Sequence, residues 1–357
     1  MISDTKAIEE PTMKSKCIAA AALMSLFSAG IVRADVKLPA IFGDHMVLQR
    51  GQKVPVWGTA DAGEQVNVSI GDTKATATAG ADGKWQLSLD SLKASDQPTD
   101  VTVTGKNTIT IKDVLVGDVW VASGQSNMEF GMNGAHNASV EIPKADHPTI
   151  RLFIVQKKTA LEPQADCVGK WDVCSPTTVG RFSAVGYFFA RDIAESQKVP
   201  VGMIGTYWGG TPAQSWTSIE ALAEHPETKT FADSFNKLRE DLPTLKEKYE
   251  KELLPAYETA HKKWQEEFGE EFTKATKQWM EDTNKAKAEG KAPTSRPVPP
   301  QPEPRKPTVP GENASIPSVL TNGMIAPIIP FAIKGAIWYQ ANLTRDRPCS
   351  IARCFRR

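Results

Sequence analysis

Apolar and polar positions alternate in short segments over the first part of the chain. Between residues 35 and 113, stretches rich in Val, Thr and Ile are separated by Gly and Asp turn signals. Residues 65–70, 85–89 and 100–104 place apolar side chains at every second position, as half-buried strands do. We therefore predict an all-β sandwich over residues 35–113.

Longer apolar runs follow from residue 114 onward. Residues 114–122 and 150–155 are almost continuously apolar, as strands buried on both faces require. Residues 182–197 have helical spacing, and residues 199–207 and 332–339 are two further apolar runs. The order strand, helix, strand predicts an α/β fold with a parallel sheet and right-handed crossovers.

An insertion of different composition interrupts this pattern at about residues 222–315. Apolar and aromatic residues and one histidine recur every three or four positions among many Lys and Glu. They are Leu245, Tyr249, Leu253, Tyr257, His261, Trp264, Phe268 and Phe272. Pro255 should kink or divide this helix, and eight prolines between Pro293 and Pro310 predict an extended return. We expect a self-contained helical hairpin whose stripe is a packing seam; the alternative is a sugar-binding platform.

The N-terminus has the pattern of an export signal. Two lysines precede an apolar run over residues 18–31, and small residues lead up to Ala34. We expect residues 1–34 to be a signal peptide, with 1–12 as an upstream extension, and the protein to be secreted or periplasmic. The apolar run is shorter than the roughly 20 residues of a membrane span, so no stable span is expected.

Charge and cysteine content narrow the possible partners. The 42 basic residues balance 42 acidic ones, so nucleic acid is not an expected partner. Cys167 and Cys174 remain after the export signal and the C-terminal tail are set aside. They form either one local disulfide or two buried thiols. Their spacing matches no zinc pattern, and no metal site is predicted.

Candidate chemistry lies where two buried strands end. Residues 124–128 read GQSNM, and Ser126 in this turn is presented to the crevice at the carboxyl edge of the sheet. A serine becomes nucleophilic when a base takes its proton, whereas the structural alternative is a helix N-cap. Gly209 and Gly210 follow the strand that ends near Thr206, so their amides should lie at the same edge and stabilise an oxyanion.

Several motifs occur together in one order along the chain. They are residues 42–50 (FGDHMVLQR), 54–58 (VPVWG), 117–120 (GDVW), 124–128 (GQSNM), 182–190 (FSAVGYFFA), 208–211 (WGGT) with Trp216, 326–327 (AP) and 337–340 (IWYQ). In these segments the chain resembles the sialate O-acetylesterase family of SGNH-type hydrolases, and the resemblance covers nearly all of it after residue 34.

The resemblance implies a fold and a mechanism. The fold would be α/β, with an SGNH or flavodoxin-like parallel sheet over residues 114–340 beside the N-terminal sandwich. Ser126 would be the catalytic serine, with Gly209 or Gly210 as oxyanion donor. The residues that would line the substrate pocket are Gln125, Asn127 and Gln340. Such enzymes remove acetyl groups from sugars through an acyl-serine, with a C-terminal Asp-x-x-His and no metal or organic cofactor.

The chain departs from that family after Gln340. The family continues with Gly-Glu-Ser-Asn, but residues 341–344 read ANLT. Loss of one G from the codons GGC GAA TCT AAC would produce this tetrapeptide, so we expect residues 341–357 to be an out-of-frame tail. No Asp-x-x-His follows, and His45, His136, His147, His225 and His261 all lie upstream. We therefore expect inactivity or trace activity as encoded.

The expected substrate is a small molecule or glycan that carries O-acetyl groups, either sialic acid or a similar acetylated sugar. An acetylesterase for plant polysaccharides is an alternative of the same class. A non-catalytic carbohydrate-binding remnant is the alternative from another class. Short motifs do not choose among sugars, because selectivity depends on loop shape.

Overall fold

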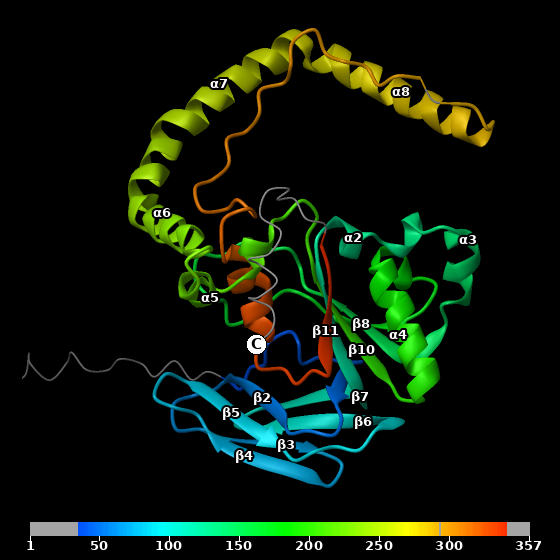
Figure 1. The fold of residues 1–357 in the computed structure, drawn as a ribbon, viewed down its shortest axis with the longest axis vertical. Coiled ribbons are helices and arrows are strands. Elements are labelled where there is room, and N and C mark those ends of the chain that lie inside the picture. The colour runs from blue at the N-terminus through cyan, green and yellow to red at the C-terminus, as the bar shows by residue number, and fades with distance from the viewer. Residues whose placement is uncertain (1–34, 293, 341–357) are drawn as a thin grey trace, which may run out of the picture.

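The structure, a computed structural model, describes residues 35–292 and 294–340. The expected signal peptide and the expected out-of-frame tail lie outside these residues. Figure 1 shows a β-rich N-terminal part, a central sheet with helices beside it, and a long helical arm that projects away. None of the described helices has the length and apolarity that crossing a membrane would require.

The N-terminal part consists of two sheets with a common core. Its strands are β1 (Val47–Gln49), β2 (Val54–Thr59), β3 (Gln65–Ile70), β4 (Thr73–Thr78), β5 (Lys84–Leu89) and β6 (Ser95–Thr104). Strands β3, β4 and β6 pair antiparallel, and β2 pairs with β5 in a separate sheet. Val68 of β3 and Leu87 of β5 belong to one buried cluster. The predicted strands are confirmed, while the sandwich arrangement stays a prediction.

Strand β7 (Thr108–Gly124) runs through both parts of the molecule. Its first half pairs antiparallel with β6. Its second half pairs parallel with β10 (Val201–Tyr207) and with β11 (Gly335–Tyr339). Beyond β10 lie β8 (His147–Ile154), which is parallel to it, and β9 (Trp171–Cys174), which is antiparallel to β8. The predicted parallel sheet is confirmed, with β9 as an additional strand.

Strands β7, β8 and β10 of the central sheet are covered on both faces. Ala122, Leu152 and Met203 lie in one hydrophobic cluster, which also holds residues of helix α4 (Ala184–Gln197). Their chain neighbours Val121, Phe153 and Ile204 lie in the other cluster, with Phe235 and Met324. Because successive side chains of a strand point to opposite faces, continuous apolar runs are needed here.

Short helical turns connect the strands. They are α2 (Ser126–Glu129), η1 (Met132–Gly134), α3 (Ala138–Glu141), η2 (Ile142–Lys144), η3 (Val179–Arg181), η4 (Ala213–Trp216), α5 (Ile219–Glu224), η7 (Thr321–Ile325) and η8 (Ala326–Ile328). Helix α4 ends at Gln197 as expected but begins at Ala184 rather than at residue 182, because the Ser183 hydroxyl accepts a hydrogen bond from the Gly186 amide at 3.0 Å and so caps the helix.

The insertion is one long helix with an extended return, so the expected helical hairpin is wrong. The helical segments follow one another without a break: α6 (Lys229–Lys248), η5 (Tyr249–Leu253), α7 (Leu254–Trp264), η6 (Gln265–Gly269) and α8 (Glu270–Ala288). The proline-rich chain runs back beside them (Figure 1). The indole nitrogens of Trp264 and Trp279 donate to the carbonyls of Gln301 and Thr294, both at 2.8 Å. Around the buried Trp264 the stripe is therefore a seam between helix and return.

Two π turns, η5 and η6, lie within the long helix. The predicted stripe does not stay on one packed face: Tyr249 and Trp264 are buried, whereas Leu245 and Leu253 are 37% and 43% exposed. A π turn takes up about one residue more than an α turn, so it shifts the face that the following residues present. The predicted effect of Pro255 is a local one, because it lies in the first turn of α7, directly after η5.

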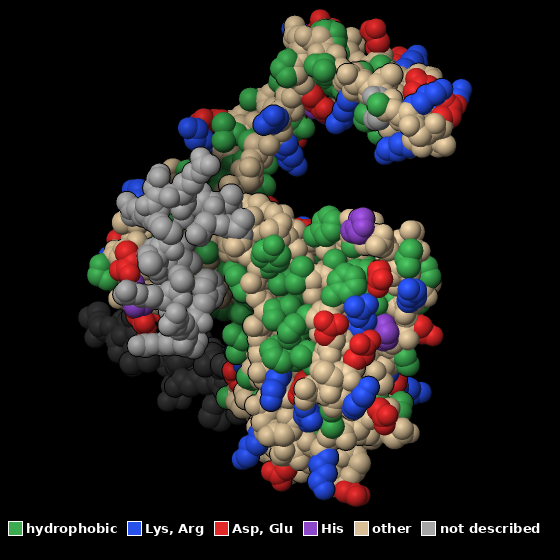
Figure 2. All heavy atoms as spheres, turned by 45° about the vertical axis from the view of Figure 1, so that its right-hand side comes forward, with side chains coloured by type: hydrophobic (Ala, Val, Ile, Leu, Met, Phe, Trp, Pro, Cys, Tyr) green, Lys and Arg blue, Asp and Glu red, His purple; other side chains and the backbone are tan. Residues whose placement is uncertain are grey.

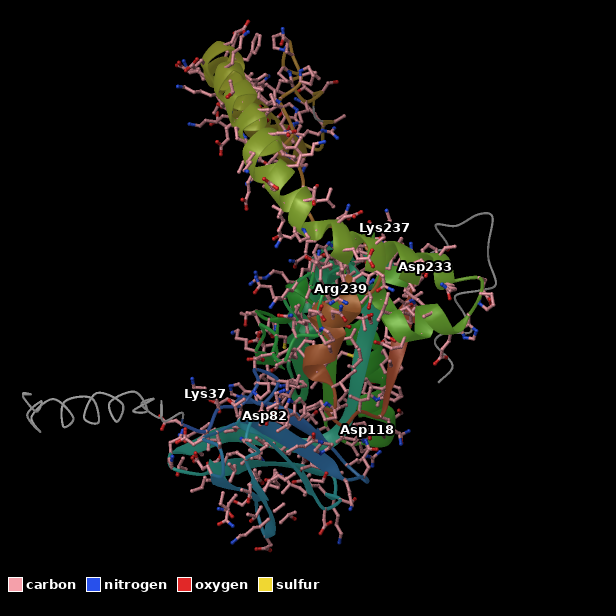
Figure 3. All side chains as sticks on the ribbon, turned by 90° about the vertical axis from the view of Figure 1, so that its left-hand side faces the viewer. Lys37, Asp82, Asp118, Asp233, Lys237 and Arg239 are labelled. Carbon is pink, nitrogen blue, oxygen red and sulfur yellow. The ribbon has the colours of Figure 1, made fainter. Side chains whose placement is uncertain are left out.

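The first turns of α6 belong to the core of the protein. Phe235 is 2% exposed and packs in the cluster that covers the central sheet. Arg239 pairs with Glu162, and Figure 3 shows it on α6 with Asp233 and Lys237. At the other end of the insertion, Gly311 lies against Leu161. The insertion is thus self-contained only beyond about residue 245, which corrects the expectation for its beginning.

Buried and half-buried ion pairs join the N-terminal part to the central sheet. The Arg50 guanidinium donates to both carboxylate oxygens of Asp118, at 2.9 and 2.8 Å, and Gln49 donates to the same carboxylate (Figure 3 marks Asp118). The hydrogen bonds from Arg50 lower the pKa of Asp118, against the opposing effect of burial. In a second cluster, Asp113 accepts from Arg151 at 2.5 Å and contacts His45 at 2.6 Å.

We predict that the outer part of the insertion is dispensable and the inner part is not. Replacing residues 246–307 by a short Gly/Ser linker should leave soluble protein with a thermal midpoint within a few degrees of the parent. Replacing residues 223–311 removes Phe235 from the core and should give aggregation, because the lost burial costs several kcal/mol. Soluble yield and thermal unfolding test this. Equal behaviour of the two deletions would contradict it.

Asp118→Asn should destabilise the protein in a pH-dependent way. The lowered pKa of Asp118 contributes stability that is present above about pH 4, where the unfolded carboxyl is ionised, and is lost as pH falls through the folded pKa. Breaking this pair should cost about 3 kcal/mol at pH 7. Urea unfolding at pH 7 and pH 2.5 should show the gap from the parent closing at the lower pH. Asp90→Asn, an exposed change, is the control, and a gap that stays constant would disprove the account.

Candidate active site

The parallel register of three strands gathers the candidate residues at one edge of the sheet. Gly124 at the end of β7 is level with Tyr207 of β10 on one side and with Tyr339 of β11 on the other. The segments that follow these strands carry Ser126, the glycine pair and Gln340. The prediction that Ser126 and the glycines share an edge is therefore confirmed. Ligands of open α/β sheets bind at this edge.

Gly124 permits the tight turn before Ser126. Its φ is +137°, and a Cβ there would lie 2.2 Å from the Tyr339 carbonyl oxygen. The same carbonyl accepts from the Gln125 amide at 3.1 Å, and the Gly124 carbonyl accepts from the Trp208 amide at 3.1 Å. No side chain fits between these backbones. The turn is thus fixed from both neighbouring strands.

Ser126 is the first residue of α2 and is exposed. The N-cap position is taken by Gln125, so the alternative role of Ser126 as an N-cap is wrong. Gln125 is 5% exposed, and its amide nitrogen lies 3.5 Å from the serine Oγ, at the outer limit of a hydrogen bond. Asn127 is exposed beside it. The serine hydroxyl is therefore open to a ligand.

The glycine pair approaches this serine through Gly209. A Cβ on Gly209 would lie 3.4 Å from the Ser126 Cβ, whereas Gly210, at φ +77°, faces open space. The Gly209 amide donates to the Glu129 carboxylate at 2.5 Å. Glu129 is in turn paired with Lys157, whose ammonium lies 5.4 Å from the centre of the Trp208 ring. One expected oxyanion donor is thus already bonded to a carboxylate.

Glu129 and Lys157 are site residues that the motif analysis did not nominate. Glu129 lies three residues after Ser126 in the same helical turn. The sequence spacing alone could therefore have placed its side chain near the serine. Lys157 follows β8, and only the parallel register brings it to α2. The pairing of Lys157 with Glu129 could not be predicted from sequence spacing, because 28 residues separate the two.

Gln340 is tied to the loop after β10. Its amide nitrogen donates to the Thr211 carbonyl at 3.0 Å, and its amide oxygen accepts from the Trp338 indole at 3.2 Å. The Trp338 ring also packs edge-on against Trp216. Within residues 35–292 and 294–340, no hydrogen bond joins Gln340 to Ser126. In this structure Gln340 holds the loop of the glycine pair.

A cleft of about 640 Å³ adjoins the serine turn. It lies between α2, the end of β8 and the turn η3, and its lining residues are Glu129, Phe130, Gly131, Asn133, Gly134, Ile154, Val155, Gln156, Lys157, Gly180, Arg181 and Tyr207. Figure 2 shows the side of the molecule that carries α2 to α4, where hydrophobic and charged side chains lie close together. Burial raises the pKa of Tyr207, whose hydroxyl accepts from the Ser183 amide.

No histidine contacts Ser126 in the described part of the chain. His45 bonds to Asp113, His147 to Tyr187 at 3.3 Å, and His261 to Glu303 at 3.0 Å on the arm. His136 and His225 make no side-chain hydrogen bond to another described residue. The structure thus places no general base on the serine among these residues.

Cys167 and Cys174 are free thiols, so the disulfide alternative is wrong. Both are buried, and burial raises their pKa values to about 11 and about 12. Such thiols stay protonated and unreactive at neutral pH. Across residues 35–292 and 294–340, no three His, Cys, Asp or Glu side chains gather as metal ligands would.

Comparison with known proteins matches this part of the chain to one family. A family model described as carbohydrate esterase, sialic acid-specific acetylesterase, matches residues 116–287. The sialate O-acetylesterase of Rattus norvegicus is 32% identical over 200 residues, which cover 50% of this chain and 37% of the relative. The Homo sapiens enzyme of the same name is 30% identical over 216 residues, which cover 55% and 40%. The chain thus spans about two fifths of the length of these relatives.

A solved structure is similar over a larger part of the chain. The crystal structure of a carbohydrate acetylesterase from Xanthomonas citri has a TM-score of 0.59 to this chain at 27% identity. The similarity covers 86% of this chain and 51% of that protein. The similarity to this structure therefore extends well beyond residues 116–287, which the family model matches.

We predict that Gly124→Ala separates β11 from the serine turn. The added Cβ would overlap the Tyr339 carbonyl, so the free energy of unfolding should fall by about 3 kcal/mol or more. Gly63→Ala is the matched control, because φ there is +78° and no atom lies within 4 Å of the added Cβ, so strain alone costs about 1 kcal/mol. Urea unfolding compares the two. Equal losses would show that the close approach does not matter.

Proposed function

We propose that the chain, which matches the carbohydrate esterase family of the sialic acid-specific acetylesterases over residues 116–287, removes O-acetyl groups from sialic acid or a similar acetylated sugar. The observation that carries the proposal is the exposed Ser126 at the carboxyl edge of the sheet, with the backbone of Gly209 beside it. A hydroxyl and a glycine backbone so placed are the parts that acyl transfer needs.

In the proposed reaction the Ser126 Oγ attacks the acetyl carbonyl carbon. A base takes the serine proton, the carbonyl oxygen becomes an oxyanion, and the sugar oxygen leaves with a proton. Water then hydrolyses the acetyl-serine and releases acetate. Backbone amides of the glycine pair would stabilise the oxyanion.

Glu129 sets a condition on this reaction. Its carboxylate holds the Gly209 amide, so an oxyanion at that amide has to displace a carboxylate that Lys157 also binds. The Gly210 amide, after an open turn, is the alternative donor. Either way the charge of Glu129 lies close to the forming oxyanion and opposes it.

The rate at which this chain hydrolyses acetyl esters should be low. Without a histidine beside Ser126 in the described residues, the hydroxyl keeps its proton at neutral pH. Loss of a triad member typically costs several orders of magnitude, and oxyanion donors retain a small part of the rate. We therefore expect trace activity.

Export of the protein, expected from the residues before Asp35, also stays a proposal.

A non-catalytic sugar-binding protein is the second candidate. Two observations favour it: the carboxylate of Glu129 occupies the Gly209 amide, and no described histidine contacts the serine. The cleft beside α2 would then bind a sugar without turnover. The two candidates differ in whether Ser126 reacts.

Hydrolysis of 4-nitrophenyl acetate separates these candidates. If the chain is an esterase, the parent should release 4-nitrophenol slowly, and Ser126→Ala should lower that rate about tenfold or more, to the background from surface amines. Ser234→Ala, an exposed serine on α6, should match the parent. Peptide mass mapping should find the acetyl group on Ser126 after brief exposure. Equal rates for the parent and Ser126→Ala would rule out the proposal that this chain is an esterase.

A further inference from the structure

A second cleft, of about 460 Å³, lies in the N-terminal part of the molecule. Its walls come from residues 37–39, from the paired strands β2 and β5, and from residues 165–166 in the loop between β8 and β9. It shares no lining residue with the cleft beside α2. Figure 1 shows β2 and β5 below the central sheet and α2 above it. The two clefts are therefore separate sites.

The pairing of β2 with β5 gathers one large ring and several polar side chains on one wall. Trp57 lies directly opposite Gln86, and Thr59 lies opposite Lys84. Side chains that are opposite each other or two positions apart share a face of an antiparallel pair. The intervening inward position is taken by Val56, which belongs to the core. The outward face of this pair thus carries an aromatic ring beside groups that can form hydrogen bonds.

Trp57 is held in place by the core while it lines the cleft. Its ring is half-buried and packs edge-on against the buried Phe42, with ring centroids 4.7 Å apart. Its indole nitrogen makes no hydrogen bond to a described residue. A tryptophan has a large apolar body and one polar N–H group. A fixed indole with an unused donor therefore suits a ligand that has both an apolar face and oxygen atoms.

The other wall carries a carboxylate of fixed orientation. One oxygen of Asp166 accepts hydrogen bonds from the amides of Ala40 and Cys167, at 2.8 and 2.7 Å. Its second oxygen makes no hydrogen bond to a described residue, and the side chain is exposed at the cleft. Two backbone donors thus orient this carboxylate before any ligand arrives. Hydrogen bonds from ligand hydroxyl groups to an ionised acceptor are among the stronger ones.

The charges of the lining nearly cancel. Lys84 pairs at 3.4 Å with Asp82, which is not part of the lining. Lys37, labelled in Figure 3, and Asp166 then leave one charge of each sign. The cleft therefore favours neither an anion nor a cation.

A peptide strand is not favoured as the ligand either. Addition of a strand needs a free backbone edge. Beside the cleft that edge of β2 is already paired, because Lys37 and Thr59 exchange two backbone hydrogen bonds, at 2.8 and 3.0 Å. A neutral ligand with hydroxyl groups around an apolar face fits the lining better.

We propose that this cleft binds a neutral sugar ring of a glycan, as a second sugar site separate from Ser126. A pyranose ring has an apolar C–H face, which fits the Trp57 ring, and hydroxyl groups that reach the Asp166 carboxylate and the Gln86 amide. The volume lies within the usual range for small-molecule sites. Binding here would keep the protein on a glycan whether or not the serine reacts, so the inference goes beyond the proposed function.

Titration with neutral oligosaccharides tests this site. Cellotetraose and xylotetraose would be added to the full chain, with affinity measured by saturation-transfer NMR. At least one of them should bind with a Kd of about 1 mM or tighter. Trp57→Ala should weaken this binding about tenfold because it removes the ring that the sugar packs on. Gln86→Ala should weaken it about threefold because it removes one neutral hydrogen bond.

Trp279→Ala is the matched control, because Trp279 is also half-buried but lies on the arm. It should bind the oligosaccharides as the parent does, and so should Ser126→Ala. Gln86 is exposed and makes no side-chain hydrogen bond to a described residue, so Gln86→Ala tests the site even where Trp57→Ala fails to fold.

Three results would each overturn the second sugar site. They are no binding of either oligosaccharide, unchanged affinity in Gln86→Ala or in folded Trp57→Ala, and loss of binding in Ser126→Ala, which would place the sugar at the serine instead. Failure of the esterase proposal has a different sign, equal release of 4-nitrophenol by the parent and Ser126→Ala. The two failures are therefore distinguishable.

Discussion

The backbone hydrogen-bond ladder along β7 is the constraint on which the rest of the structure depends. One strand of 17 residues pairs antiparallel with β6 and then parallel with β10 and β11. The N-terminal sheet and the central sheet are therefore held by the same strand. The approach of its neighbours is close: a Cβ on Gly117 would lie 1.9 Å from the Pro200 carbonyl oxygen. Displacing this strand would move both halves of the molecule and the serine turn at its end.

The candidate site follows from that ladder together with a small set of charges. Ser126 is exposed because the strand before it ends against Tyr339 and the chain must turn outward. Glu129, one turn later, lies between a backbone amide and Lys157, so the anion next to the serine belongs to the protein itself. That arrangement opposes formation of an oxyanion at the Gly209 amide.

The arm shows how an extended chain can line a single helix. The proline-rich return offers carbonyl groups to Trp264 and Trp279, because a polyproline-like segment has no internal hydrogen bonds. Leu245 and Leu253 of the same helix stay exposed, and the two π turns shift the face that the helix presents along its length. Among the described residues of α6, Phe235 belongs to the main core.

The sequence by itself determined the strands, the parallel order, the helical character of the insertion and the shared edge of Ser126 and the glycine pair, because these depend on periodicity and on local turn residues. It did not determine that Gln340 holds the Thr211 loop or that Cys167 and Cys174 stay apart. Nor did it place Arg181 in a cleft with Lys157. The Gln340 bond and the shared cleft join residues far apart in the chain, and the separation of the two thiols, like them, depends on strand register and side-chain direction. Only tertiary packing decides both, because no local pattern specifies which distant groups meet.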